Sequence, residues 1–314
     1  MQFSFNAILS AFGGSIRSTM QNPQPGIGHV RSICHGRATR VLCVAAAILA
    51  LSIPALADNY ATAISPFGVG NEAPYNITHP GSYQLTGDLV TTTTTAIKIS
   101  AANVTLDLNG FTISCSVCRG VPGIVSSGTG TTVQNGTFGG FGGTGAGNPY
   151  GIQFEAAGGR VDHVTVEWNY IGVYGASGAE VVVTNSRVVN NTWKGISCPN
   201  SQLTVMNTTV SGNGHFGIEL AAGLITGSTI TGNGSSGELT RGGIIFAGNG
   251  GMVNVTNNLI ANNTFAGISS EGLTEAGVLG YGSNTFGGNC CGGDVTADST
   301  LISMKNNVNA GGVF

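Results

Sequence analysis

Short alternations of apolar and polar residues recur along most of the chain. At 218–220 (Ile-Glu-Leu), two aliphatic side chains point to one side of a strand and a carboxylate points to the other. This period of two residues is typical of a short β-strand with one buried face. The same alternation occurs at 203–205 (Leu-Thr-Val) and 253–255 (Val-Asn-Val). No segment after residue 57 keeps the period of an amphipathic helix, so the pattern predicts an all-β protein.

A glycine followed by isoleucine or valine marks a longer repeat. The glycines of these pairs are Gly123, Gly151, Gly172, Gly195, Gly217, Gly243 and Gly267. Their spacing is about 22 residues once two insertions, 139–147 and 235–240, are removed. Units of this length bury their apolar faces by stacking on one another, which predicts a solenoid.

Asparagine forms a second marker that stays in phase with the first. It lies a few residues before the next glycine pair, at Asn169, Asn191, Asn213, Asn233 and Asn263. A further polar residue or glycine lies six residues before each of these, at His163, Asn185, Asn207, Gly227 and Asn257. The consensus of a leucine-rich repeat is missing. The two markers therefore predict a parallel β-helix (solenoid) with about eight rungs of roughly 22 residues, a rung being one full turn of the chain.

Stacking of rungs explains an unusual composition. Only 8% of the residues are charged, whereas 52 of the 314 are glycine. Successive rungs lie about 4.8 Å apart, so each side chain faces its equivalent on the next rung. A column of like charges repels itself at that distance, while a column of amides both donates and accepts hydrogen bonds. We expect glycine to supply the backbone conformations of tight turns, and Val, Ile and Leu to fill the core.

The start of the repeat resembles a known family. Residues 81–89 read Gly-Ser-Tyr-x-Leu-x-x-Asp-Leu and residues 104–110 read Val-Thr-Leu-Asp-Leu-Asn-Gly, before the Gly-Ile rungs begin. This order is similar to that of the right-handed parallel β-helix repeat proteins of the pectate-lyase-like superfamily, over roughly residues 76–289. The resemblance implies a right-handed solenoid. It implies no single activity, because that superfamily contains lyases, hydrolases, epimerases, adhesins and proteins without a known activity.

The N-terminal residues have the pattern of an export signal. Arg31, Arg37 and Arg40 precede an apolar run at 41–51, and 55–57 (Ala-Leu-Ala) fits the small-x-small cleavage rule. We therefore expect a secreted or extracytoplasmic protein that does not contact the membrane after cleavage. An uncleaved membrane anchor is the alternative, although the apolar run is short for a membrane span. The predicted organisation is an N-terminal extension with signal at 1–57, a lead-in at 58–75, the β-helix at 76–289 and a C-terminal cap at 290–314.

The cysteines after residue 57 fit an exported protein. They are Cys115, Cys118, Cys198, Cys290 and Cys291, and their odd number requires at least one free or intermolecular thiol. Cys115-x-x-Cys118 lacks a second pair at metal-ligand spacing, so a local disulfide is favoured over a redox or metal motif. For Cys290 and Cys291, pairing with each other and pairing elsewhere both stay open.

Two rows of side chains are candidates for a ligand-binding groove. If the residue after each glycine points inward, the next one points outward, and that row reads Gln153, Tyr174, Ser197, Glu219, Ile245 and Ser269. The row two residues before each glycine reads Pro149, Tyr170, Trp193, His215, Arg241 and Phe265. Aromatic rings beside polar groups suit sugars. The alternative is that the rings pack on one another and cover the edge of the core. The predicted groove residues are Tyr170, Tyr174, Trp193, Lys194, Arg241 and Phe265.

Catalytic candidates in the same band are His215 and Glu219. A polysaccharide lyase needs a base and a cation or Ca²⁺, and a glycosidase needs two carboxylates. Asp162-His163 resembles a pectate-lyase segment, but it falls at a turn position of the repeat, so we favour a structural role. The residue sets typical of polygalacturonases and pectate lyases are missing, as is an acidic cluster for Ca²⁺. We therefore expect no cofactor, with Ca²⁺ only in the case of a lyase.

Three functions follow from these patterns. The favoured one is a surface or glycan-binding module whose partner is a polysaccharide. The second is a polysaccharide lyase or glycosidase acting around His215 and Glu219, and the third is a structural surface protein that associates through its strand edges. A net charge of −3, with the 11 Lys and Arg scattered, argues against nucleic acid as a partner. The sequence specifies neither the ligand nor the oligomeric state.

Overall fold

The computed structural model describes most of the chain after residue 60. The chain divides into two units, Met1–Asp58 and Asn59–Phe314, and every described residue belongs to the second. The predicted signal at 1–57 therefore lies outside the described residues. These are residues 61–66, 73–92, 94–115, 117–118, 120–142, 150–234, 242–247, 251–269, 278–290, 293–296, 300–303, 307–309 and 312–313.

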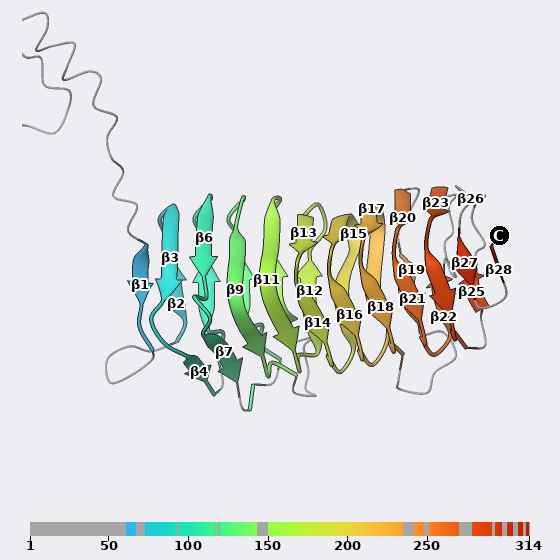
Figure 1. Ribbon diagram of the computed structural model, residues 1–314. Coiled ribbons are helices and arrows are strands. Elements are labelled where there is room, and N and C mark those ends of the chain that lie inside the picture. Colours follow the sequence, from blue (N-terminus) through green and yellow to red (C-terminus); the bar gives the residue numbers. More distant parts are fainter. Residues whose placement is uncertain are drawn as a thin grey trace, which may run out of the picture. The chain divides into compact units, whose positions relative to one another are not determined.

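The described residues form a right-handed parallel β-helix with three strand columns, here called the first, second and third faces. The first face contains β2 (Tyr75–Ile77), β5 (Ile97–Ile99), β8 (Ile124–Ser126), β10 (Tyr150–Phe154), β12 (Ile171–Gly175), the start of β15 (Lys194–Met206), the start of β17 (Ile218–Thr226), β19 (Ile244–Phe246), β22 (Ala266–Ser269) and β25 (Gly293–Thr296). In Figure 1 the strands of successive rungs lie side by side.

The second and third faces complete each rung. The second contains β1 (Thr62–Ile64), β3 (Gly81–Leu85), β6 (Val104–Asp107), the start of β9 (Thr132–Gly139), the start of β11 (Gly159–Glu167), β13 (Glu180–Thr184), the ends of β15 and β17, β20 (Met252–Thr256), β23 (Val278–Gly282) and β26 (Thr300–Ser303). The third contains β4 (Leu89–Thr91), β7 (Thr112–Cys115), the ends of β9 and β11, β14 (Arg187–Val189), β16 (Thr209–Ser211), β18 (Thr229–Thr231), β21 (Leu259–Ala261), β24 (Thr285–Gly287) and β27 (Val308–Asn309), with β28 (Gly312–Val313) antiparallel to β27.

The Gly-Ile marker aligns successive rungs as the sequence predicts. On the first face Val173 pairs with Ile196, which in turn pairs with Ile218. All three side chains are fully buried, and the neighbouring apolar positions of the column share one continuous core. The aliphatic column inside the solenoid is therefore confirmed.

The asparagine marker forms an interior hydrogen-bonded ladder. Asn191 Nδ2 donates to Asn213 Oδ1 at 2.9 Å, and Asn213 Nδ2 donates to Asn233 Oδ1 at 2.9 Å. The backbone N–H of each residue donates to the same oxygen of the next, at 3.0 Å from Asn191 and 3.2 Å from Asn213. These three side chains are at most 1% exposed. The ladder runs through Asn169, Asn191, Asn213, Asn233, Asn263 and Asn289.

From Gly151 onward, the glycine of each pair is required by this ladder, because a Cβ there would crowd a ladder asparagine. A Cβ on Gly172 would lie 2.6 Å from the backbone oxygen of Gly195 and 2.9 Å from Asn191 Nδ2. A Cβ on Gly195 would meet Gly217 and Asn213 in the same way. The sequence pattern assigns glycine to the tight turns, but at this position its role is to let the amide ladder approach the backbone. The Gly-Ile marker and the asparagine marker therefore recur in phase because the glycine of one packs directly against the asparagine of the other.

The earlier polar marker lies at the turn between the second and third faces. His163, Asn185 and Asn207 have φ angles of 55°, 50° and 51°, a left-handed conformation that asparagine and glycine adopt more readily than other residues. A second interior ladder is formed at this turn by the side chains that directly follow the marker residues. His163 is a marker residue with a positive φ angle, so its side chain is not part of that ladder. That second ladder runs through Ser186, Thr208, Ser228, Asn258, Asn284 and Asn307.

Rung length varies more than the sequence predicts. The turns average about 24 residues, because insertions lengthen some rungs. Successive ladder asparagines are 22 residues apart at Asn169–Asn191 but 30 apart at Asn233–Asn263. The strand columns also extend past the predicted bounds of 76–289, since β1 already pairs with β3 and β26 continues the second face.

Three of the four cysteines in the described residues are disulfide-bonded. Cys115 and Cys118 form the predicted local disulfide, and Cys290 is also disulfide-bonded. Cys198 is free and buried in the core, and burial raises the pKa of its thiol to about 12. Cys291 lies outside the described residues. Among the described residues, no helix is long and apolar enough to cross a bilayer.

Candidate functional site

The predicted outward row lies on the first face in register. Tyr174 pairs with Ser197, Ser197 pairs with Glu219, and Glu219 pairs with Ile245. Gln153 precedes Tyr174 in the same row. The strands therefore hold these side chains in one line along the solenoid, as predicted for the second residue after each glycine.

Three aromatic side chains stack at the turn that leads into the first face. The rings of Tyr170 and Trp193 lie 5.9 Å apart with an interplanar angle of 4°, and those of Trp193 and His215 lie 4.0 Å apart at 24°. Backbone hydrogen bonds set this spacing, because Trp193 N donates to Tyr170 O and His215 N donates to Trp193 O. We call these three residues the ring stack. All three rings are half-buried, and each packs against at least one other ring of the stack.

Other aromatic side chains lie on the first face and at its turns. Tyr150 and Tyr174 stack on the first face with centroids 4.1 Å apart. Phe216 packs edge-on against His215 at 4.2 Å and is itself buried. Phe265 is half-buried at the corresponding turn further along the solenoid. Arg241, which the sequence places between His215 and Phe265, lies outside the described residues.

The predicted groove residue Lys194 and the predicted catalytic residue Glu219 form an ion pair. Lys194 Nζ donates to Glu219 Oε2 at 2.6 Å, and the Ser197 hydroxyl donates to the same oxygen. The Lys194 and Glu219 side chains are only 16% and 10% exposed. Charges that are largely removed from water persist when they are paired and hydrogen-bonded. Lys194 therefore compensates Glu219, while the His215 ring packs on Trp193 and Phe216.

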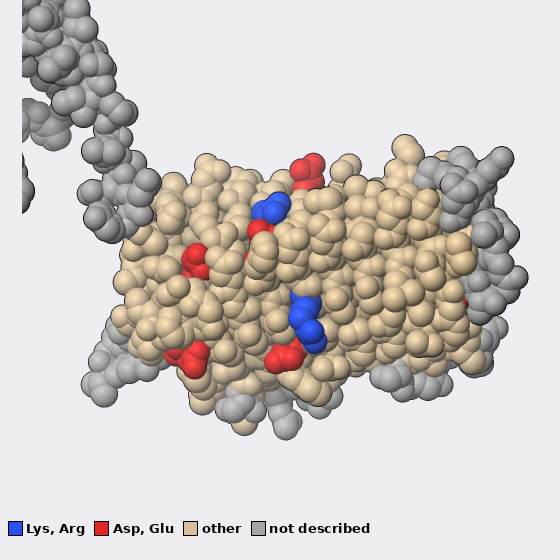
Figure 2. Space-filling view, viewed as in Figure 1, with Lys and Arg blue, Asp and Glu red and all other residues tan. Residues whose placement is uncertain are grey.

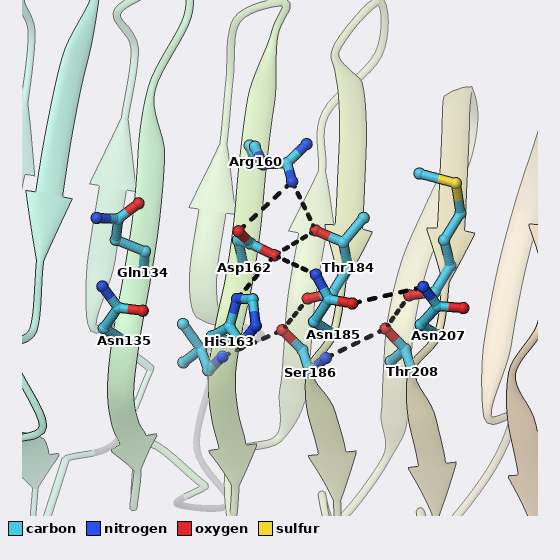
Figure 3. Close-up of polar contacts among 12 residues, drawn as sticks. Gln134, Asn135, Arg160, Asp162, His163, Thr184, Asn185, Ser186, Asn207 and Thr208 are labelled. Carbon is cyan, nitrogen blue, oxygen red and sulfur yellow. Dashed lines mark hydrogen bonds and ion pairs between the residues drawn. The ribbon is translucent and has the colours of Figure 1, made fainter.

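A second polar cluster surrounds Asp162 on the second face (Figure 3). Its Oδ1 accepts hydrogen bonds from Thr184 Oγ1 at 2.6 Å and Asn185 Nδ2 at 2.9 Å, and lies 3.2 Å from His163 Nδ1. Arg160 NH2 lies 3.5 Å from Oδ2 and also donates to Thr184. Burial by itself would raise the pKa of Asp162, but these hydrogen bonds and the charge of Arg160 lower it to about 2. Asp162 thus ties one rung to the next, which supports the structural interpretation of Asp162-His163.

A shallow hollow of about 390 Å³ lies on the second face nearer the N-terminal rungs. Polar side chains line it, among them Gln84, Asp107 and Gln134. Gln134 and Asn135 both donate to Asp107 Oδ2, at 3.0 and 3.1 Å, so the carboxylate is already bonded within the protein. No group of three or more His, Cys, Asp or Glu side chains in the described residues could hold a metal ion. Figure 2 shows a face on which charged side chains are few and scattered.

The family model described as "right handed beta helix region" matches residues 95–253 and 151–309 in two overlapping alignments. The chain belongs to this family. No curated protein matches the sequence. The right-handed solenoid that the resemblance implied is therefore shown both by the family and by the strand columns.

Solved structures resemble this β-helix in fold. The mannuronan C-5 epimerase AlgE6 A-module of Azotobacter vinelandii is 14% identical, with 79% of this chain and 88% of that chain covered and a TM-score of 0.49. ORF18 of Geobacillus virus E2 is 12% identical, with 76% and 56% covered and a TM-score of 0.50. The Dettilon tailspike protein is 12% identical, with 79% and 62% covered and a TM-score of 0.40. At this identity the likeness concerns the fold alone.

One exposed residue of the β-helix escaped the sequence analysis. Trp168 is 57% exposed and adopts φ 57° at the turn between the third and first faces. The residue before each ladder asparagine occupies this position, and elsewhere it is Asn or Gly. When the rungs are aligned on their ladder asparagines, and not on the Gly-Ile pairs, Trp168 stands out as the one large residue in this row. The equivalent residues are Asn190, Gly212, Gly232, Asn262 and Gly288.

Proposed function

We propose that this protein is an extracytoplasmic β-helix that binds a polysaccharide along the band formed by the ring stack and the Tyr150–Tyr174 pair. The observation that carries the proposal is the presence of stacked rings on successive rungs, with ring centroids 4.0 to 5.9 Å apart. A surface that repeats with each rung suits a ligand that is itself a repeating polymer.

The chemistry of the band matches that of a sugar. Tyr, Trp and His each combine an apolar ring with a polar tip, and sugars combine apolar C–H groups with hydroxyls. Tyr170 and Trp193 are half-buried, so part of each ring faces solvent. Because neighbouring rings already support them, binding would cost little side-chain entropy. The low charge of the chain favours a ligand recognised by hydrogen bonds and ring contacts.

Export is part of the proposal. The predicted signal at 1–57 supports it, and so does the Cys115–Cys118 disulfide, because disulfides persist mainly in oxidising compartments.

Affinity electrophoresis in gels containing neutral and uronate polysaccharides tests the proposal. We expect at least one polysaccharide to retard the purified protein, and Trp193→Ala and Tyr170→Ala to weaken that retardation by about tenfold. Val90→Ala is the control, since Val90 is 57% exposed but lies on the third face, in β4. If no polysaccharide retards the wild-type protein, or if both ring variants behave like Val90→Ala, the proposal fails.

Catalysis at His215 and Glu219 is the alternative function. The largely buried Lys194–Glu219 pair beside the ring stack favours it, because such networks also occur in active sites. However, the Glu219 oxygen that meets Lys194 and Ser197 is occupied, whereas a general base needs a free lone pair directed at its substrate. Incubation with uronate and neutral polysaccharides, with and without Ca²⁺, tests whether the protein cleaves any of them. Cleavage that His215→Ala and Glu219→Gln both abolish would establish the enzyme, and cleavage that survives both would exclude this site.

A further inference from the structure

Trp168 is an exception in a row of otherwise small or amide-bearing residues. The row turns the chain from the third face to the first, and every position in it has a positive φ angle. Before Trp168 stands Gly140 with φ 86°, and after it stands Asn190 with φ 55°. Register fixes these neighbours, because Glu167 pairs with Gly139 on one side and with Val189 on the other. A bulky side chain in the left-handed region is an outlier that the fold itself does not require.

The indole of Trp168 is presented differently from the other rings of the band. It is 57% exposed, whereas Tyr170, Trp193 and His215 are half-buried and stack on one another. Neither Gly140 nor Asn190 carries a ring that could cover it. Trp168 lies two residues before Tyr170, at the turn that leads into the same strand of the first face. The band therefore has one large ring that is more than half exposed to solvent.

We propose that Trp168 is the residue on which a sugar unit of the bound polysaccharide stacks, with the face of the indole against the C–H face of the sugar. This inference rests on the proposed function and names a recognition residue within it. The ring stack contributes edges and hydrogen-bonding tips, and Trp168 contributes the flat apolar surface. Its unfavourable backbone conformation is then retained for binding, because asparagine or glycine would satisfy the turn better.

The chain contains two tryptophans, which makes Trp168 directly observable. In Trp193→Phe the ring stack keeps an aromatic ring, and Trp168 becomes the sole indole. Titration with the polysaccharide that retards the wild-type protein should shift the fluorescence of this variant to shorter wavelength, and the shift should saturate with the binding curve. An emission spectrum that stays unchanged at saturating ligand would overturn the inference.

Substitution separates binding from folding at this position. We expect Trp168→Asn to weaken polysaccharide binding by about tenfold or more, while its melting temperature equals or exceeds that of wild type, because Asn190 and Asn262 already adopt this conformation. Trp168→Phe retains a ring and should keep most of the affinity. A merely structural role for Trp168 would instead lower the melting temperature of Trp168→Asn and leave its binding unchanged.

The outcomes distinguish this inference from the proposal beneath it. If Tyr170→Ala weakens binding and Trp168→Asn does not, the polysaccharide site stands and the role of Trp168 is refuted. If the wild-type protein binds no polysaccharide, the proposed function fails and the inference fails with it.

Discussion

Asn213→Ala removes one member from the middle of the interior ladder. The Asn213 side chain is fully buried. Its Nδ2 donates to Asn233 Oδ1 at 2.9 Å and to Val188 O at 3.2 Å. Its Oδ1 accepts from the backbone N and the Nδ2 of Asn191, at 3.0 and 2.9 Å. The substitution therefore deletes four hydrogen bonds in a region without competing water.

The expected loss is a large share of the total stability. A buried hydrogen bond contributes about 0.5–1.5 kcal/mol net, so four are worth about 2–6 kcal/mol. The free energy of unfolding of a typical domain is about 5–15 kcal/mol. Alanine cannot rebuild the contacts, and the neighbouring amides on both sides stay buried with fewer partners. We therefore expect a clear fall in the urea midpoint.

Urea unfolding followed by circular dichroism measures the effect, with Asn207→Gly as the matched control. Asn207 is exposed at the turn and has φ 51°, a conformation that glycine adopts without strain. We expect Asn207→Gly to change the free energy of unfolding by about 0.5 kcal/mol or less. If Asn213→Ala cost no more than Asn207→Gly, the ladder would not stabilise the solenoid in the way described.

Two further predictions concern titratable groups. The pKa of Asp162 is lowered from 3.8 to about 2, so its carboxylate stabilises the fold above pH 4 and this contribution is lost as the pH falls from about 4 to about 2; Asp162→Asn should flatten the melting temperature over that window, and an unchanged profile would contradict the network. Cys198 is buried with a pKa near 12, so iodoacetamide at pH 8 should leave it unmodified in the folded protein and alkylate it in urea; rapid alkylation of the folded protein would show that the thiol is accessible.

The fold follows from the sequence because each rung repeats the same contacts. Gly195 and Asn213 must both be present for one ladder bond to form, so the two residue types recur in phase and the period is visible without a structure. The aliphatic column is equally visible, since Ile196 and Ile218 meet the same neighbours on every rung. Positions that have the same neighbours on every rung favour the same residue types, so the sequence repeats with the rungs.

Rung length and the second ladder are less visible. Loops between the faces lie outside the stacked columns, so insertions such as that between Asn233 and Asn263 change the period without disturbing the core. The second ladder changes residue type from Ser186 and Thr208 to Asn258, because a hydroxyl and an amide can both accept the backbone hydrogen bond. Because Ser, Thr and Asn all occur in this ladder, no single residue type repeats and the ladder cannot be recognised from the sequence.

The candidate site was predictable in position but not in arrangement. The sequence placed Tyr170, Trp193 and His215 in one row, yet whether rings face a ligand or one another depends on side-chain rotation, which a period cannot specify. The structure shows that they face one another. The predicted binding and catalytic roles of the row stay predictions. Trp168 was missed because alignment on glycine hides a row defined by its backbone conformation.

The register of the rungs is the central claim, and cysteine cross-linking tests it most directly. Thr209 in β16 and Thr229 in β18 are paired in register on the outer side of the third face, and Leu259 in β21 is paired with Thr229 on the rung beyond. Paired strands lie about 4.8 Å apart, within disulfide reach, whereas residues two rungs apart are about 9.6 Å apart and outside it. Under mild oxidation we expect a disulfide in Thr209→Cys/Thr229→Cys and none in Thr209→Cys/Leu259→Cys, as read by mass spectrometry of unreduced digests. Equal cross-linking of both pairs, or of neither, would contradict the stacked solenoid.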